Sequence, residues 1–360
     1  MQVYLFIISI TFIFAILSIN RNTKKITVLW CSVFLFIILS LFAGTRLFGF
    51  DYDNYKDHFE ECPYIYNYYR YITTMELGYE LFVSFCKSIS TSFHFFLLFF
   101  TCLSIGITLK LCYKYSPYPL VSFLMFFAYS FFTQVMGQMR QPIAISITYL
   151  LLLPLILKKK YLSSIILIVT TAFLLHKSLF FLLFGLIVNN KILSKRIIKI
   201  IICITIGCYT SSTILIKILP QIVPQNFYLY EVAIIYLTDK SNALLFSMGM
   251  IERIVMCLII WFYVRKYQLY NQSLLRLFVN FYFIGTCLYF ATIALSADFA
   301  SRGTQVLGYS LFFILPIIYK NVKLKDKKRL LIIIVLWSLY LSMTFMRSQN
   351  IFLPYKSVIF

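Results

Sequence analysis

Apolar runs long enough to cross a lipid bilayer recur along the whole of this sequence, and short polar or basic stretches separate them. A helix needs roughly 20 apolar residues to cross a hydrocarbon core about 30 Å thick. Hydrophobic residues occupy 61% of the 360 positions and charged residues only 12%, which excludes a water-soluble globular protein. We therefore predict an all-α polytopic membrane protein with about 12 transmembrane helices, which form a single transmembrane domain over residues 1–360. The predicted spans are residues 1–20, 26–44, 92–111, 118–135, 141–157, 161–175, 178–190, 197–215, 243–264, 274–295, 304–319 and 330–346.

Positive charge is concentrated in the loops that follow every second predicted span. Cytoplasmic loops of membrane proteins retain Lys and Arg in this way, so we expect these loops to be cytoplasmic and both termini to lie outside. The net charge of +21 is then a topology signal, and we predict no nucleic-acid partner. Residues 161–190 are too few for two full spans, which leaves either two short helices or a re-entrant hairpin. The basic loops are residues 21–25, 110–114, 158–160, 191–199, 265–276 and 320–329.

Two longer segments, residues 45–91 and 216–242, lie on the predicted outer side. The first contains five of the chain's twelve acidic residues, between Asp51 and Glu61. Apolar residues at helical spacing predict an amphipathic helix over residues 76–90 that lies along the membrane interface. The nine cysteines fall mostly within apolar runs and form no CxxC pair, so the sequence predicts neither a disulfide framework nor a metal site.

Three arginines and a histidine are predicted to lie at one depth, near the outer surface of the membrane. They are Arg46, Arg140, His176 and Arg302. Counting about 1.5 Å per helical residue from the nearest cytoplasmic cluster gives each a height of roughly 24 to 31 Å, at the outer edge of the hydrocarbon core. Arginine suits phosphate at this depth, because its planar fork donates bidentate hydrogen bonds and keeps its charge. The alternatives are that an arginine at a helix end merely extends to the interface, and that His176 only packs.

The acidic triplet Asp51-Tyr52-Asp53 is the second candidate for chemistry. In an extended loop its two carboxylates would point the same way. Nucleotide sugars bound through a metal are not expected outside the cytoplasm, so we expect an acid–base role or a contact with a sugar hydroxyl, with a nearby arginine keeping the carboxylates ionised. The alternative is a solvated acidic loop. Glu252 and Arg253, in the middle of a predicted span, either tie helices together or line a cavity.

The segment GTRLFGFDYDNYKDHF, residues 44–59, resembles the first signature of the EpsG family, the Wzy-type polysaccharide polymerases. Further segments agree with the family's order along nearly the whole chain. They are MELGYELF at 75–82, MRQPIAISI at 139–147, LLHKSLF at 174–180, SRGTQVLGYSLFFILP at 301–316 and PYKSVIF at 354–360. Residues 190–295 carry almost no recognisable signature, which leaves the sugar specificity open.

The resemblance implies a GT-C-like, multi-span, lipid-dependent glycosyltransferase of the bacterial inner membrane that polymerises O-antigen or another surface polysaccharide. Donor and acceptor would both be oligosaccharides linked to undecaprenyl pyrophosphate. The other partners it implies are the lipid bilayer, a chain-length regulator and a flippase. No cofactor is expected, and no metal, because arginines would neutralise the leaving group. The alternatives are a flippase or exporter of the lipid-linked unit and an O-antigen ligase.

Residue roles follow from the resemblance together with the charge pattern. A carboxylate would accept the proton of the attacking sugar hydroxyl, and arginines would stabilise the departing pyrophosphate. The candidate catalytic residues are Asp51, Asp53, Glu76 and His176. The candidate pyrophosphate ligands are Arg46, Arg140 and Arg302. The candidate substrate contacts are Tyr52, Tyr55 and Gln141.

Overall fold

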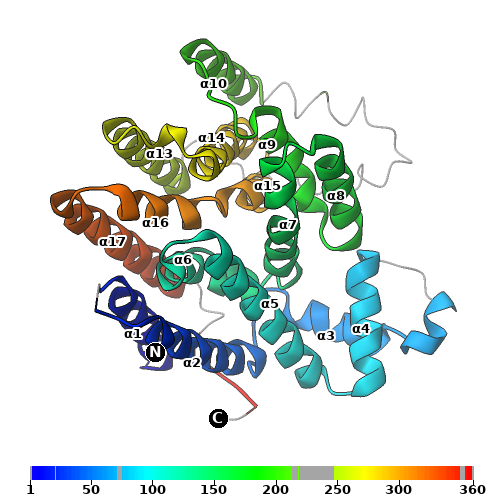
Figure 1. The fold of residues 1–360 in the computed structure, drawn as a ribbon. Helices are drawn as coiled ribbons and strands as arrows, with labels where there is room; N and C mark the ends of the chain where they lie inside the picture. The colour runs from blue at the N-terminus through cyan, green and yellow to red at the C-terminus, as the bar shows by residue number, and fades with distance from the viewer. Residues whose placement is uncertain are drawn as a thin grey trace. The chain divides into compact units, whose positions relative to one another are not determined.

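The computed structural model describes residues 2–20, 22–70, 75–212, 218, 247–348 and 353–358. This part of the chain is almost entirely helical (Figure 1), and its extended pairing consists of one isolated β-bridge. The predicted all-α class is therefore confirmed. Over the described ranges, five helices are long and apolar enough to span a membrane: α1 (Gln2–Ile19), α2 (Lys25–Gly44), α5 (Phe93–Tyr115), α7 (Arg140–Leu157) and α14 (Ser273–Ile293).

The other predicted spans also coincide with helices, which are shorter or more polar. These helices support a polytopic membrane protein, whereas the total of about 12 spans stays a prediction. The span predicted over residues 304–319 is divided in two at residues 309–310, where the Ser310 hydroxyl donates to the Leu307 carbonyl at 2.6 Å. The helices are α6 (Pro119–Phe126) continuing into the π-helix η2 (Phe127–Val135), α8 (Tyr161–Leu174), η3 (Lys177–Phe181) with α9 (Leu182–Val188), α10 (Lys195–Thr210), α13 (Met248–Lys266), α15 (Ala297–Gly308), α16 (Leu311–Asn321) and α17 (Leu324–Ser348).

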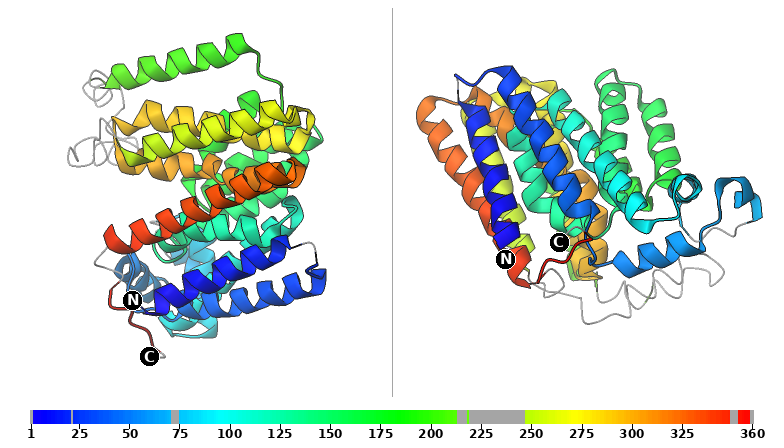
Figure 2. Two further views of the ribbon diagram at one scale, coloured as in Figure 1. Left: turned by 90° about the vertical axis from the view of Figure 1, so that its left-hand side faces the viewer. Right: turned by 90° about the horizontal axis from the view of Figure 1, so that it is seen from below.

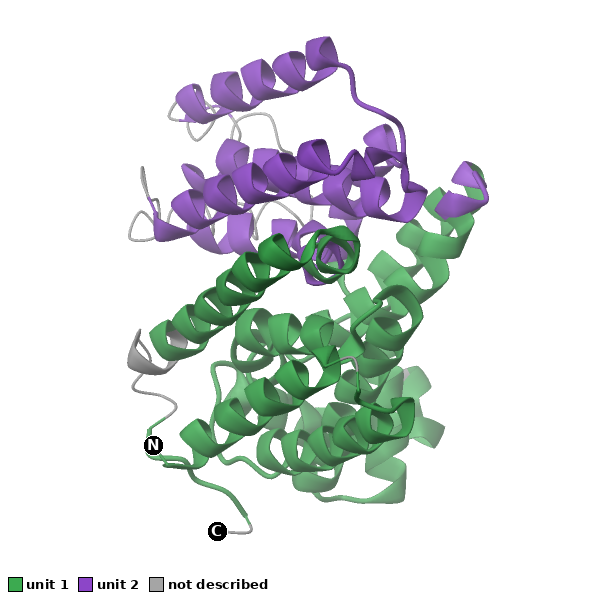
Figure 3. Ribbon diagram, turned by 60° about the vertical axis from the view of Figure 1, so that its left-hand side comes forward, with its two compact units in different colours: residues 1–155, 162–177, 315–360 green, residues 156–161, 178–314 purple. Residues whose placement is uncertain are grey.

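The chain divides into two compact units (Figure 3). Unit 1 contains residues 1–155, 162–177 and 315–360, and unit 2 contains residues 156–161 and 178–314. The single transmembrane domain stays a prediction. So does the second outer segment, since residues 216–217 and 219–242 lie outside the described residues.

Unit 1 is built around aromatic side chains on α6 and η2. Phe126, Phe127 and Phe131 are fully buried there. Helix α1 packs on α6, α2 on α5, and η2 on α17, while α1 and α2 lie side by side (Figure 2). The Thr108 and Ser146 hydroxyls share a hydrogen bond of 2.9 Å that links α5 to α7, as small polar residues commonly do between membrane helices.

Three shorter elements follow α2 in unit 1: α3 (Tyr52–Glu61), the 3₁₀ helix η1 (Ile65–Arg70) and α4 (Leu77–Ile89). The extended loop expected around Asp51 and Asp53 is therefore wrong. Asp51 is the residue before α3, and Asp53 stands in its first turn, where a carboxylate interacts favourably with the helix dipole. The helix forms because Tyr52, Tyr55 and Phe59 recur on one face and are buried against α4 and α5.

Unit 2 is organised around α14, which packs against α9, α10, α13 and α15. Gly285 allows α15 to approach closely, because a Cβ at this position would lie 2.8 Å from Leu307 Cβ. Arg253 of α13 is buried and lies 4.2 Å from the Tyr289 ring centroid on α14, and its Nη2 donates to Thr304 Oγ1 on α15 at 3.4 Å. Of the two roles considered for Arg253, these contacts favour tying helices together.

Candidate active site

Arg46 is a fully buried cation just beyond the end of α2. Its Nη1 donates to the Ala43 carbonyl, whereas Nε and Nη2 have no hydrogen-bond partner among the described residues. Within the same residues no carboxylate forms an ion pair with it. Burial lowers the pKa of Arg46 to about 10, which still leaves the guanidinium charged at neutral pH. A buried charge with open donors is costly, and an anion bound beside it would remove that cost.

The loop that carries Arg46 rests on the turn between η2 and α7. Gly49 has φ +152°, and a Cβ there would clash with the Met136 carbonyl oxygen. Only glycine tolerates both the backbone conformation and the close approach. The loop of residues 45–50 is therefore held on one side by the close approach of Gly49 to the Met136 carbonyl, which any side chain at position 49 would prevent.

We expect Gly49→Ala to displace the Arg46 loop and to destabilise unit 1 by about 1–3 kcal/mol, the usual cost of such a strained backbone. The measurement is the unfolding transition of the purified protein in detergent. Gly207→Ala on α10 is the matched control, because no atom lies within 4 Å of a Cβ there. Alanine in a helix is favoured over glycine by roughly 0.5–1 kcal/mol, so this control should be slightly stabilised. Equal behaviour of the two variants would contradict the contact.

The C-terminal segment holds the same loop from another side. Residues Arg46 and Ser357 form an antiparallel bridge. The Leu47 amide donates to the Lys356 carbonyl at 3.1 Å, and the Val358 amide donates to the Thr45 carbonyl at 2.9 Å. Figure 2 shows this segment beside the end of α2.

Arg140, the first residue of α7, forms an ion pair with Glu76, the residue before α4. The side chains are 22% and 7% exposed. Glu76 Oε1 also accepts from the Lys177 amide at 3.4 Å, which brings the start of η3 to the pair. The Arg140 guanidinium lies 5.3 Å from the Tyr79 ring centroid and 5.9 Å from that of Tyr55. Its charge is therefore balanced inside the protein, unlike that of Arg46.

Tyr55 connects the two arginines. It is buried on α3, and burial raises its pKa while the Arg140 charge opposes the rise. The Arg46 guanidinium also interacts electrostatically with Tyr52 and Tyr55. The structure thus brings together Arg46, Arg140 and two of the predicted substrate contacts, all within unit 1.

The remaining predicted site residues differ in burial and in whether they contact the residues around Tyr55. Asp51 is half-buried and interacts electrostatically with Tyr55, whereas Asp53 is exposed. Gln141 is fully buried, and its Oε1 accepts from Gln134 Nε2 at 3.1 Å. His176 is half-buried next to Lys177. Arg302 is half-buried on α15 of unit 2, so its role stays a prediction.

Two residues that sequence reasoning missed lie beside the ion pair. Glu80 is fully buried and accepts from the Tyr68 hydroxyl at 2.8 Å and from the Met75 amide at 2.7 Å. His58 stacks on Tyr79 with ring centroids 5.6 Å apart, and burial lowers its pKa while the Glu80 charge opposes the fall. The three-residue step from Tyr55 to His58 would have placed His58 on the buried face, had α3 been recognised as a helix.

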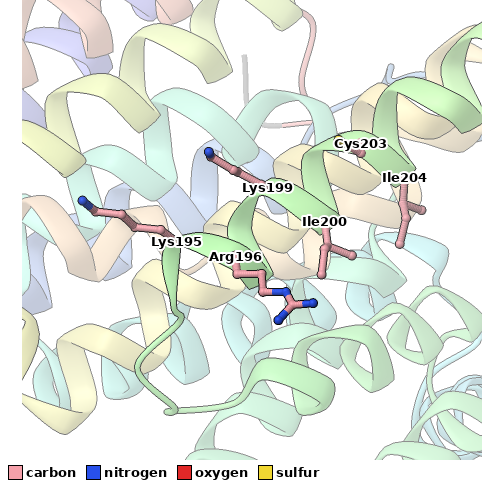
Figure 4. Close-up of a pocket in the computed structure, with 6 residues that line it drawn as sticks. All are labelled: Lys195, Arg196, Lys199, Ile200, Cys203 and Ile204. Carbon is pink, nitrogen blue, oxygen red and sulfur yellow. The ribbon is translucent and has the colours of Figure 1, made fainter.

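No group of three or more His, Cys, Asp or Glu side chains that could hold a metal ion occurs in the part of the chain that the structure describes. An open pocket of about 450 Å³ lies on α10 (Figure 4). It contains none of the predicted site residues, and its lining begins in the basic loop 191–199 that is predicted to be cytoplasmic and continues along α10. Its lining residues are Lys195, Arg196, Lys199, Ile200, Cys203 and Ile204.

Comparison with known proteins identifies the family. The model of the EpsG family matches residues 27–357, nearly the whole chain and all the site residues described above. No curated protein and no solved structure matches the sequence. The match begins within α2, includes the Arg46 loop, and ends within the segment that pairs with it. The chain therefore belongs to the EpsG family, whose members are Wzy-like polymerases.

Proposed function

We propose that this protein joins oligosaccharide repeat units carried on undecaprenyl pyrophosphate, at the outer face of the bacterial inner membrane. The observation that carries the proposal is the fully buried Arg46, which keeps two open donor groups and no counter-charge among the described side chains. A pyrophosphate supplies both the negative charge and the acceptor oxygens that this site lacks. The family assignment supports a polymerase of this general kind.

In the proposed reaction, the acceptor sugar hydroxyl attacks the anomeric carbon of the donor chain. The new glycosidic bond forms as the bond from that carbon to the pyrophosphate oxygen breaks, and the bonding electrons leave with the pyrophosphate. Arg46 binds the oxygens on which this charge develops, and Arg140 of the same unit is a further ligand. Groups fixed before the reaction stabilise such a transition state without reorganisation.

The general base in this scheme is Asp51. Glu76 is already engaged, because it forms an ion pair with Arg140 and accepts from the Lys177 amide. Asp53 is exposed at the start of α3 and is better placed to stabilise the helix. Asp51 is half-buried and interacts electrostatically with Tyr55. It is therefore neither held in an ion pair with a described residue, as Glu76 is, nor exposed to solvent, as Asp53 is.

Asp51→Asn is expected to lower the polymerisation rate by about 10²–10⁴-fold, the usual contribution of a general base. Asp53→Asn is the matched control and should have a much smaller effect, because its carboxylate is exposed. Rates are measured with purified, reconstituted protein at saturating substrate. The base assignment is wrong if both variants are fully active.

The function itself is tested by incubating purified protein in liposomes with a defined undecaprenyl-pyrophosphate-linked repeat, with and without a chelator. A ladder of glycan lengths that persists with the chelator supports the proposal. Transfer of the unit across the bilayer without elongation would instead identify a flippase. Transfer of the glycan only to lipid A core, when that acceptor is added, would identify a ligase.

A further inference from the structure

We propose that the C-terminal segment Leu353–Val358 is a positioning element that fixes the backbone of Arg46 for ligand binding. This inference rests on the proposed role of Arg46 as a pyrophosphate ligand. It goes beyond that role by assigning a positioning function to residues that take no part in the proposed reaction. Tyr355 is the side chain that anchors the segment.

The backbone contacts bracket Arg46 on both sides. Residues 45–47 follow the end of α2, where the Thr45 amide makes the last helical bond, to the Leu41 carbonyl at 3.1 Å. The segment accepts from the Leu47 amide through Lys356 and donates to the Thr45 carbonyl through Val358. A buried backbone group without a partner costs about as much as a lost hydrogen bond, so this pairing specifies one conformation for the residue between them.

Tyr355 attaches the segment to the last turns of α2. Its ring stacks on Phe42, with centroids 4.7 Å apart and an interplanar angle of 9°, and its hydroxyl donates to the Phe42 carbonyl at 2.8 Å. Tyr4 of α1 and Phe48 contact the same ring edge-on at 6.0 and 5.6 Å. Phe42 precedes Arg46 by one helical turn, so the anchor and the bridge act on the same short stretch.

The contacts indicate positioning rather than neutralisation of Arg46. The hydrogen bonds between the segment and residues 42–47 use backbone groups of that stretch and the Thr45 side chain. None of them uses the open Nε and Nη2 of Arg46. The segment therefore restrains where the guanidinium stands and leaves its donors for a ligand.

The decisive variant is Val358→Pro, which removes the amide that donates to Thr45. Its matched control is Val358→Ala, which keeps the amide and shortens an exposed side chain. Affinity is measured with inorganic pyrophosphate as a competitive inhibitor of polymerisation. We expect the inhibition constant to rise about tenfold for the proline variant, the equivalent of one good hydrogen bond, and to change little for the alanine variant.

A double-mutant cycle with Arg46→Met separates positioning from general destabilisation. If the segment acts through Arg46, Val358→Pro causes no further loss of pyrophosphate affinity in the Arg46→Met background. An equal further loss there would overturn the proposal, as would faster turnover in Val358→Pro, which would make the segment a cover. If Val358→Pro is not recovered folded, Tyr355→Ala compared with Tyr355→Phe gives the same test, with the larger loss expected for alanine.

The cycle also distinguishes failure of this proposal from failure of the proposed function. If Arg46→Met itself leaves pyrophosphate affinity unchanged, the ligand role of Arg46 is wrong. If Arg46→Met weakens binding and Val358→Pro does not, only the positioning role is wrong.

Discussion

Arg46→Met is expected to lower the polymerisation rate by about 10²–10³-fold, the usual cost of losing one group that stabilises transition-state charge. Its stability in detergent should be unchanged or higher. The reason is that methionine fills similar space without a buried charge that lacks a partner. Loss of activity combined with retained stability is typical of a residue kept for function. The measurements are glycan chain length, initial rate and the thermal unfolding midpoint of the same preparation.

Two controls complete this experiment. Arg46→Lys keeps the charge but loses the planar fork, so intermediate activity is expected. Arg329→Met removes an arginine that is 60% exposed and paired with Asp326, and it should leave the rate unchanged. A normal ladder of chain lengths from Arg46→Met would exclude it from the site. Lower activity accompanied by a proportionate fall in stability would make it a structural residue.

Glu76→Gln is expected to destabilise unit 1 by about 3–5 kcal/mol, because it leaves the Arg140 charge largely buried and unbalanced. The double variant Glu76→Gln/Arg140→Met should recover most of that loss, since both charges are then gone. Stability is measured as the unfolding transition in detergent for both single variants and the double variant. The coupling energy from this cycle reports the ion pair itself.

The exposed pair Lys56–Glu60 provides the control for this cycle. Its side chains are 49% and 60% exposed, and its charges lie 3.9 Å apart. Exposed pairs of this kind contribute roughly 0–1 kcal/mol, so Glu60→Gln should be nearly silent. Simple additivity at Glu76 and Arg140 would contradict the pairing. The double variant, if folded, should remain inactive, because the proposed phosphate ligand is missing.

The helical architecture could be predicted from the sequence because apolar run length is a strong local signal. The predicted span at 26–44 and the observed α2 (Lys25–Gly44) differ by one residue at the start. Counting helical rise predicts that Arg46 and Arg140 lie at one depth, which stays a prediction, while the structure shows that both interact electrostatically with Tyr55. Both results depend on regular helices whose rise per residue is known.

The pairing of charges could not be predicted in the same way. Glu76 and Arg140 are 64 residues apart, and nothing local to either position indicates the other. The same is true of Arg46 and Ser357. Helix α3 was missed for a different reason: its two-residue acidic repeat suggested extended backbone, whereas the spacing of Tyr52, Tyr55 and Phe59 determined the fold.

The bridge between Arg46 and Ser357 also has a consequence for biosynthesis. The hydroxyl of Tyr355 and the carbonyl of Phe42 that it contacts are 313 residues apart. At about 5–20 residues per second, a ribosome needs some tens of seconds to travel that distance. Helix α2 is therefore synthesised well before the segment Leu353–Val358 that contacts it exists. If the segment positions Arg46 as proposed, the nascent chain carries an unfinished site during that interval, and the site is complete only when translation has reached the bridging residues.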